Sequence, residues 1–205
     1  MTKPSGTDQL GTCRSQRCPP AAAAFAALTA GANAQFANLF GDQEDAASIN
    51  GPEGIAFTDF DQDGDLDMIV AAYSAWVVYS VENLGGGEFG QPQALTPTSG
   101  AQYRYPAKVR VADLDGDGLN DLVVNSFVQD RVSWLRGVGG GSYGAVVDIA
   151  TGLDGCLGLE AVDLDSDGDI DLVTSSVNHN EILFHENMGG ANYASPSVIS
   201  SASDG

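Results

Sequence analysis

Three short segments place aspartates at alternate positions around a glycine, a pattern that can bind a metal ion. They run from Asp59 to Asp67, from Asp113 to Asp121 and from Asp163 to Asp171, and each fits D-x-D-x-D-G-x-x-D. When the glycine at position six turns the chain, the carboxylates at positions one, three, five and nine converge, and the seventh residue offers its carbonyl oxygen. An all-oxygen shell of this kind is typical of calcium, so we expect about three Ca²⁺ ions.

The predicted metal ligands are the first, third, fifth, seventh and ninth residues of each segment. They are Asp59, Asp61, Asp63, Asp65, Asp67, Asp113, Asp115, Asp117, Leu119, Asp121, Asp163, Asp165, Asp167, Asp169 and Asp171. Leu119 stands where the other segments have Asp65 and Asp169, so the seventh residue is expected to contribute only its carbonyl.

A helical calcium site, a zinc site and a metal-free turn each fit these segments less well. A helix-loop-helix calcium site has glutamate at position twelve, whereas Val70, Val124 and Thr174 stand there. Zinc is disfavoured because no cysteine or histidine lies nearby. Solvated acidic turns remain the metal-free alternative, but a turn needs one or two such residues rather than four alternating carboxylates.

A second signature shows that the segments belong to a repeated unit. Glycine-rich turns that end on an aromatic residue occur at Gly85–Phe89, Gly139–Tyr143 and Gly189–Tyr193, each beginning 26 residues after the first aspartate of its segment. The segments themselves start 54 and 50 residues apart, at 59, 113 and 163. A period of about 50 residues is typical of supersecondary repeats.

The apolar residues around each segment predict β-strands. Alternating patterns precede the aspartates at Ile55–Thr58 and Val109–Ala112, and apolar runs follow them at Leu66–Val70 and Leu122–Val124. A third run aligns in all repeats, and a fourth follows the glycine turn, for example at Ala145–Ile149. Four short strands form a small antiparallel sheet that cannot bury both faces alone, so the repeats must stack.

From Gly54 to about Ile199 the chain resembles the FG-GAP and VCBS repeats, which form the blades of integrin-alpha-like β-propellers. The resemblance rests on the aspartate pattern, the apolar strand after it and the asparagine-glycine turn ending on an aromatic, as in Asn83–Phe89 and Asn187–Tyr193. Gly137 replaces that asparagine in the middle repeat. The resemblance implies an all-β fold of three four-stranded antiparallel blades, each with a calcium site in the hairpin between its first two strands.

These blades are expected at about residues 53–104, 105–155 and 156–205, after a linker at 35–52. Propellers close with about 4 to 8 blades, so three blades predict an incomplete ring. Three alternatives follow: an open arc, a ring completed by partner chains or self-association, or a fragment whose further blades lie elsewhere.

The first 34 residues have the order of a secretory signal. Lys3, Arg14 and Arg17 precede the apolar run Ala21–Ala30, and Ala32-Asn33-Ala34 offers a cleavage site. We therefore expect a protein that is secreted or displayed on the cell surface; a flexible leader or an organelle transit peptide is the alternative. Cleavage would remove Cys13 and Cys18 and leave Cys156 as the single thiol.

Charge narrows the possible partners. The chain has 28 acidic and 8 basic residues, a net charge of −20, which disfavours nucleic acids and anionic membrane surfaces. No apolar stretch has the length of a membrane helix, so membrane insertion is not expected.

An aromatic loop is the candidate recognition surface. The predicted ligand-binding residues are Tyr103, Arg104 and Tyr105, with Tyr73 and Phe127 in neighbouring loops. The alternative is that these rings cover a blade junction. The sequence thus predicts a calcium-binding, non-enzymatic module for protein or glycan recognition; part of a polysaccharide-acting enzyme and a structural spacer are the rival functions.

Overall fold

The computed structural model describes residues 49–85, 88–96 and 105–201, and all of its regular structure in these ranges is β-strand. Repeat 1 contains β1 (Pro52–Thr58), β2 (Asp67–Ala72), β3 (Val77–Val81) and β4 (Gln93–Ala94). Repeat 2 contains β5 (Pro106–Ala112), β6 (Asp121–Ser126), β7 (Arg131–Gly139) and β8 (Ser142–Thr151). Repeat 3 contains β9 (Cys156–Val162), β10 (Asp171–Ser176), β11 (Glu181–His185) and β12 (Ser197–Ser201). A helix able to cross a membrane does not occur among the described residues.

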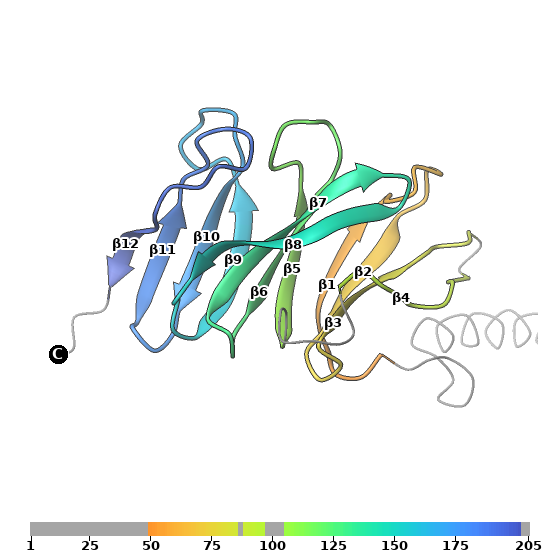
Figure 1. Cartoon of the computed structure of the whole chain (residues 1–205), viewed down its shortest axis with the longest axis horizontal. Helices are drawn as coiled ribbons and strands as arrows, with labels where there is room; N and C mark the ends of the chain where they lie inside the picture. The colour runs from red at the N-terminus through yellow and green to blue at the C-terminus, as the bar shows by residue number, and fades with distance from the viewer. Residues whose placement is uncertain (1–48, 86–87, 97–104, 202–205) are drawn as a thin grey trace, which may run out of the picture.

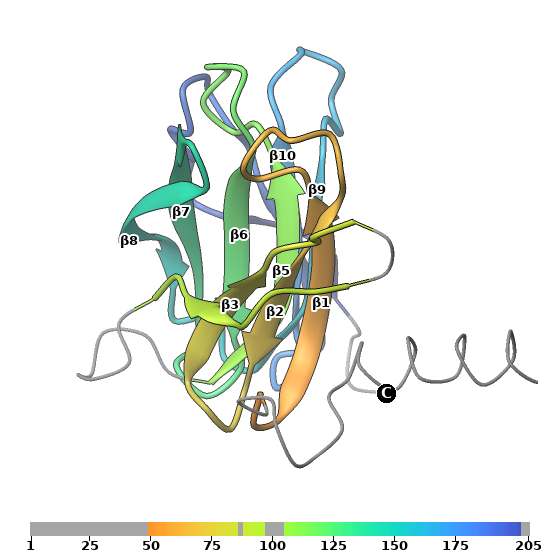
Figure 2. The ribbon, with the colours of Figure 1, turned by 90° about the vertical axis from the view of Figure 1, so that its right-hand side faces the viewer.

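Each repeat is one four-stranded antiparallel sheet whose strands follow the order of the chain. The three sheets stand in a row, with the first strands β1, β5 and β9 next to one another (Figures 1 and 2). The predicted all-β fold of three four-stranded blades is confirmed. The row is not closed into a ring.

Tight turns connect the strands at the same positions in all repeats. Trp76, Asp130 and Asn180 each lie 17 residues after the first aspartate of their repeat and have positive φ angles of 61°, 52° and 57°. Asparagine and aspartate tolerate this left-handed conformation, whereas it is unusual for a tryptophan. Repeat 1 therefore places a strained aromatic residue where the other repeats have a small polar one.

Two apolar cores hold the row together, one at each junction between neighbouring sheets. Between repeats 1 and 2 the buried residues are Ile69, Ala71, Val78, Val109, Leu122, Val124 and Leu135. Between repeats 2 and 3 they are Leu114, Val123, Val132, Ala150, Leu153, Cys156, Leu159, Leu172 and Leu183. The sheet of repeat 2 is thus covered on both faces, as the stacking argument requires.

Several sequence predictions fall outside the described residues. They are the leader at residues 1–34, most of the linker at 35–52, and Tyr103 and Arg104. Cys156, by contrast, is described: it is a buried free cysteine, and burial raises the pKa of its thiol to about 11.

Candidate metal centres

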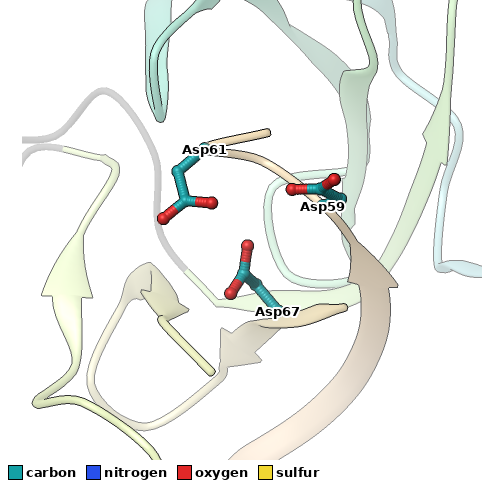
Figure 3. A group of neighbouring side chains, drawn as sticks. All are labelled: Asp59, Asp61 and Asp67. Atoms are coloured by element: carbon teal, nitrogen blue, oxygen red, sulfur yellow. The ribbon is translucent and has the colours of Figure 1, made fainter. Parts of the chain in front are cut away.

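In each repeat the aspartate segment forms the loop between the first and second strands, at the same rim of the row (Figure 1). Each loop gathers the carboxylates of positions one, three and nine, with one oxygen from each lying within 4.8 Å of the others. The three groups are Asp59, Asp61 and Asp67; Asp113, Asp115 and Asp121; and Asp163, Asp165 and Asp171. In repeat 1 the side chains point into one shared space (Figure 3).

The ninth aspartate ties each loop to the end of the third strand. Asp67 is fully buried, and its Oδ2 accepts the N–H of Phe60 at 3.0 Å while its Oδ1 accepts the N–H of Asn83 at 2.8 Å. Asp121 and Asp171 accept the equivalent pairs of backbone N–H groups. These donors hold the carboxylate in a fixed direction, as a preorganised metal ligand requires.

Burial raises the pKa of Asp121, and the backbone N–H groups of Gly137 and Leu114 oppose that rise. The negative charge of Asp115 adds to it. A cation between these carboxylates would favour their ionised form.

The first aspartate of each loop stabilises the turn at position six. The Oδ2 atoms of Asp59, Asp113 and Asp163 accept the N–H of the sixth residue at 3.1, 2.8 and 3.2 Å. That residue is a glycine with a φ of +85° to +100° in all three loops. Such a conformation favours glycine, which explains why the pattern contains one there.

The fifth and seventh residues lie differently from the first, third and ninth. The Oδ1 atoms of Asp63, Asp117 and Asp167 each accept the N–H of the residue two positions later, at 2.9 Å. The third aspartate of each loop accepts the same kind of bond, so this contact shapes the loop at both positions. The fifth carboxylate lies outside the groups of three that gather within 4.8 Å. The side chains of Asp65, Leu119 and Asp169 are also outside these groups.

A cation already neighbours the loop of repeat 2. The guanidinium of Arg136 donates to Asp115 Oδ2 at 2.5 Å and to Asp117 Oδ2 at 2.8 Å. Its neighbouring carboxylates raise the pKa of Arg136. Repeats 1 and 3 have Glu82 and Glu186 at this position, so the three loops differ in local charge although their motifs agree.

The glycine turn of each later repeat binds the loop of the repeat before it. The N–H of Gly141 donates to the carbonyl of Phe60 at 3.0 Å, and the N–H of Ala191 donates to the carbonyl of Leu114 at 3.1 Å. Tyr143, the aromatic residue of the turn in repeat 2, packs against the core between repeats 1 and 2. Burial there and the charges of Asp121 and Asp67 raise its pKa to about 12. The equal offset within each repeat has a different physical reason: the ninth aspartate accepts the N–H of the residue two positions before the glycine turn, namely Asn83, Gly137 or Asn187.

Gly137, the departure from the family pattern, changes one contact in this arrangement. In the other repeats the asparagine side chain donates to the carbonyl of the eighth loop residue, as Asn83 does to Leu66 at 3.1 Å. A Cβ on Gly137 would lie 2.4 Å from the carbonyl oxygen of Asn120, the equivalent residue. Repeat 2 thus replaces a side-chain hydrogen bond with a close backbone approach.

The rim opposite the aspartate loops carries part of the predicted recognition surface. The ring of Tyr105 lies 5.1 Å from that of Tyr73 and 5.3 Å from that of Trp76, measured between centroids. Tyr73 and Tyr105 are thus brought together, and Phe127 occupies the position of Tyr73 in the next repeat. Sequence reasoning missed Trp76; its alignment with Asp130 and Asn180 was the available signal.

A comparison with family models agrees with this architecture. A family model described as FG-GAP-like repeat matches residues 59–124 and 113–174, each match beginning at a first aspartate. No curated protein matches the chain. Among solved structures, an Agrocybe aegerita lectin described as recognising non-reducing terminal N-acetylglucosamine aligns at 21% identity with a TM-score of 0.49. This alignment covers 70% of the chain and 37% of the lectin, so the chain spans little more than a third of that protein. The matched repeats together cover more than half of the sequence, and the chain belongs to the FG-GAP-like repeat family.

Proposed function

We propose that this chain is a calcium-binding propeller module of a secreted or cell-surface protein and that it acts in protein or glycan recognition. One observation carries the calcium assignment: the same three carboxylates gather within 4.8 Å in all three repeats. Like charges this close repel one another unless a cation offsets them. A net charge of −20 adds to that repulsion.

The donor set favours calcium over other divalent ions. The gathered side chains supply only carboxylate oxygens, and zinc sites use cysteine and histidine far more often. Calcium accepts six to eight oxygens in flexible geometry, so loop carbonyls and water can complete a shell that three aspartates begin. Magnesium demands a stricter octahedron.

The proposed recognition surface is the aromatic group of Tyr73, Trp76 and Tyr105. Trp76 is 38% exposed and has a positive φ, a conformation that costs energy for a bulky residue and often marks a functional position. Aromatic side chains provide large contact areas at binding hot spots. A Trp76→Ala variant should lose binding in screens of glycans and extracellular proteins while its melting temperature changes little. Binding that survives this substitution would place recognition elsewhere.

We propose a binding role rather than an enzymatic one because both histidines have structural surroundings. His185 is buried and bonded to Thr174 Oγ1 at 2.9 Å, and His179 lies in a turn, 3.2 Å from Asp154. A polysaccharide-acting enzyme and a structural spacer remain the rival functions. A spacer would show no ligand-dependent stabilisation beyond that given by calcium.

Thermal unfolding with and without calcium tests the metal assignment. Sites of extracellular modules bind with a Kd of roughly 10⁻⁴ to 10⁻³ M. At calcium concentrations of about 100 times Kd, each occupied site stabilises the native state by about 2.7 kcal/mol, so chelation with EGTA should lower the melting temperature strongly.

Matched variants separate specific binding from general charge screening. A triple variant Asp61→Asn, Asp115→Asn and Asp165→Asn removes one carboxylate from each group and should lose most of the calcium response. The control variant Glu53→Gln, Asp148→Asn and Glu181→Gln removes the same charge elsewhere and should keep it. Equal responses of the two variants, or a melt that EGTA leaves unchanged, would contradict the calcium assignment.

A further inference from the structure

A pocket lies between repeats 1 and 2, beside the outer strands of repeat 1. Its volume is about 420 Å³, and it forms where the turn between β7 and β8 meets the aspartate loop of repeat 1 (Figure 1). Phe60 of that loop, Ser80 of β3 and Tyr143 of β8 line it. Volumes of roughly 300–1,000 Å³ are typical of small-molecule sites.

Repeat 1 has a small residue in this pocket where the other repeats have a large ring. Ser80 and Gln93 face each other across β3 and β4, and the equivalent pair in repeat 2 is Trp134 and Val147. Trp134 packs against the core between repeats 2 and 3, and repeat 3 has Phe184 at this position. A serine fills little of that volume, so the first junction keeps an open pocket at the place of the ring.

The aromatic walls of the pocket are held firmly. The carbonyl of Phe60 accepts the N–H of Gly141 at 3.0 Å, and a Cβ on Gly141 would lie 2.9 Å from the Phe60 ring. Tyr143 packs against the same core as Phe60. Repeat 3 has Ala191 in place of Gly141, so the close approach of ring and turn belongs to the first junction. Walls fixed in this way favour a preorganised site.

The remaining lining is polar and rich in hydrogen-bond acceptors. Glu82, Gln91, Gln93 and Ser142 line the pocket with exposed side chains. Nε2 of Gln93 donates to the carbonyl of Gln91 at 3.3 Å, which leaves the side-chain oxygen of Gln93 as an acceptor. A carboxylate accepts only, whereas amides and hydroxyls both donate and accept.

This lining favours a neutral ligand that carries several hydroxyl groups. None of the described residues around the pocket is a lysine or an arginine, and the carboxylate of Glu82 and the net charge of −20 both disfavour anions. A purely apolar ligand would bury the polar side chains without partners. Hydroxyl groups donate to carboxylate and amide oxygens, while aromatic rings cover C–H groups. A sugar residue offers both kinds of group.

We propose that this pocket binds a neutral sugar residue, with Glu82, Gln91 and Gln93 bonded to its hydroxyl groups and Phe60 and Tyr143 beside its ring. The pocket lies at the rim of the aspartate loops, whereas the aromatic recognition surface lies at the opposite rim. It is therefore a second site. A ligand of about a dozen heavy atoms binds such a site with a Kd of about 1 mM or weaker, and the washing steps of a glycan screen remove a ligand held so weakly.

Titration of the full chain with glucose, galactose and mannose, followed in amide NMR spectra at constant calcium, tests this inference. At least one sugar should shift the backbone N–H signals of Gln91, Gln93 and Ser142. Glucuronate, which adds a negative charge to the glucose ring, should bind more weakly. The absence of shifts with every neutral sugar, shifts confined to other residues, equal binding of glucuronate, or uptake of the cationic probe lysine amide instead of sugar would each overturn the proposal. Because calcium is the same in all samples, these comparisons do not depend on the calcium assignment.

A double variant that fills the pocket tests its position. Ser80→Trp with Gln93→Val places the cross-strand pair of repeat 2 in repeat 1, and the new ring should abolish the sugar-induced shifts. The melting temperature should not fall, because the second junction already contains this pair. Sugar binding that survives in this variant would contradict the proposed site.

Glu82→Gln tests the polar contacts without changing the size of the side chain. Loss of the carboxylate acceptor should weaken sugar binding by about two- to tenfold. Glu186→Gln is the matched control, because Glu186 is the equivalent residue of repeat 3 and its loss removes the same charge. That variant should bind sugar as the natural chain does. Equal affinities of the two variants would contradict a contact between Glu82 and the sugar.

Discussion

Repeat 2 and its two flanking repeats carry the same aspartate loop in different surroundings. Leu114 and Leu164 occupy the same motif position, yet Leu114 is 1% exposed and Leu164 is 51% exposed. The turn of repeat 3 covers Leu114, and no later repeat covers Leu164 in the described structure. The neighbouring repeat therefore determines whether the side chain at this motif position is buried, as in other stacked repeat proteins.

The repeats also differ in the charge of the side chain next to the aspartate loop. Arg136 donates to two carboxylates of the loop in repeat 2, while glutamates stand at this position beside the flanking loops. The loops therefore share one backbone pattern but should not share one calcium affinity.

The largest effect is expected from truncating the two equivalent leucines. Leu114→Ala should cost about 2–5 kcal/mol of unfolding free energy, because it removes buried methyl groups and leaves a cavity. Leu164→Ala should cost less than about 1 kcal/mol, since its side chain is already hydrated. Denaturant unfolding of each variant gives both values. Equal losses of unfolding free energy would show that the contact between repeats does not stabilise the fold through Leu114.

A smaller, pH-dependent effect should distinguish repeat 3 from the others. His185 is buried and paired with Thr174, where repeat 2 has Leu135 and Val124. Burial lowers the pKa of His185 from 6.5 to about 4. Between these values the unfolded chain binds the proton and the folded chain does not, so stability falls as the pH falls through this window. The loss should approach about 3 kcal/mol near pH 4.

The double variant Thr174→Val, His185→Leu places the apolar pair of repeat 2 in repeat 3. It also removes Nδ1 of His185, a buried nitrogen that has no hydrogen-bond partner among the described residues. Between pH 7 and pH 4.5 the variant should lose less unfolding free energy than the natural chain. Because acid also protonates the aspartate loops in both proteins, the difference between the two losses is the quantity to compare. Identical losses would show that His185 is not the titrating group.

The repeats made much of this fold predictable from the sequence. Three occurrences of one spacing located the loops, and the apolar runs on both sides located the strands that the structure shows. The gathering of the first, third and ninth aspartates also followed from spacing, since a glycine turn brings those positions together.

Contacts between distant segments could not be predicted in the same way. The fifth aspartate matches the ligand pattern, and only the loop geometry shows that it accepts the N–H of the seventh residue. Arg136 reaches Asp115 across 21 residues, and its side-chain direction depends on the hairpin that carries it. The hydrogen bond from Ala191 to Leu114 joins two repeats. A local pattern contains no information on how such repeats stack.

The smallest expected effect is on calcium affinity in repeat 2. Arg136 forms ion pairs with Asp115 and Asp117, so we expect it to compete with a metal ion for the Asp115 carboxylate. Ion pairs of an exposed arginine contribute little, so Arg136→Ala should tighten calcium binding in this loop by no more than about fivefold. Calorimetric titration in an Asp61→Asn, Asp165→Asn background isolates the middle loop. Arg131→Ala is the matched control, because it removes the same charge from β7 while Arg131 pairs with Asp148 rather than with the loop. If both arginine variants tighten binding equally, net charge alone sets the affinity, and if neither does, Arg136 does not compete with the ion.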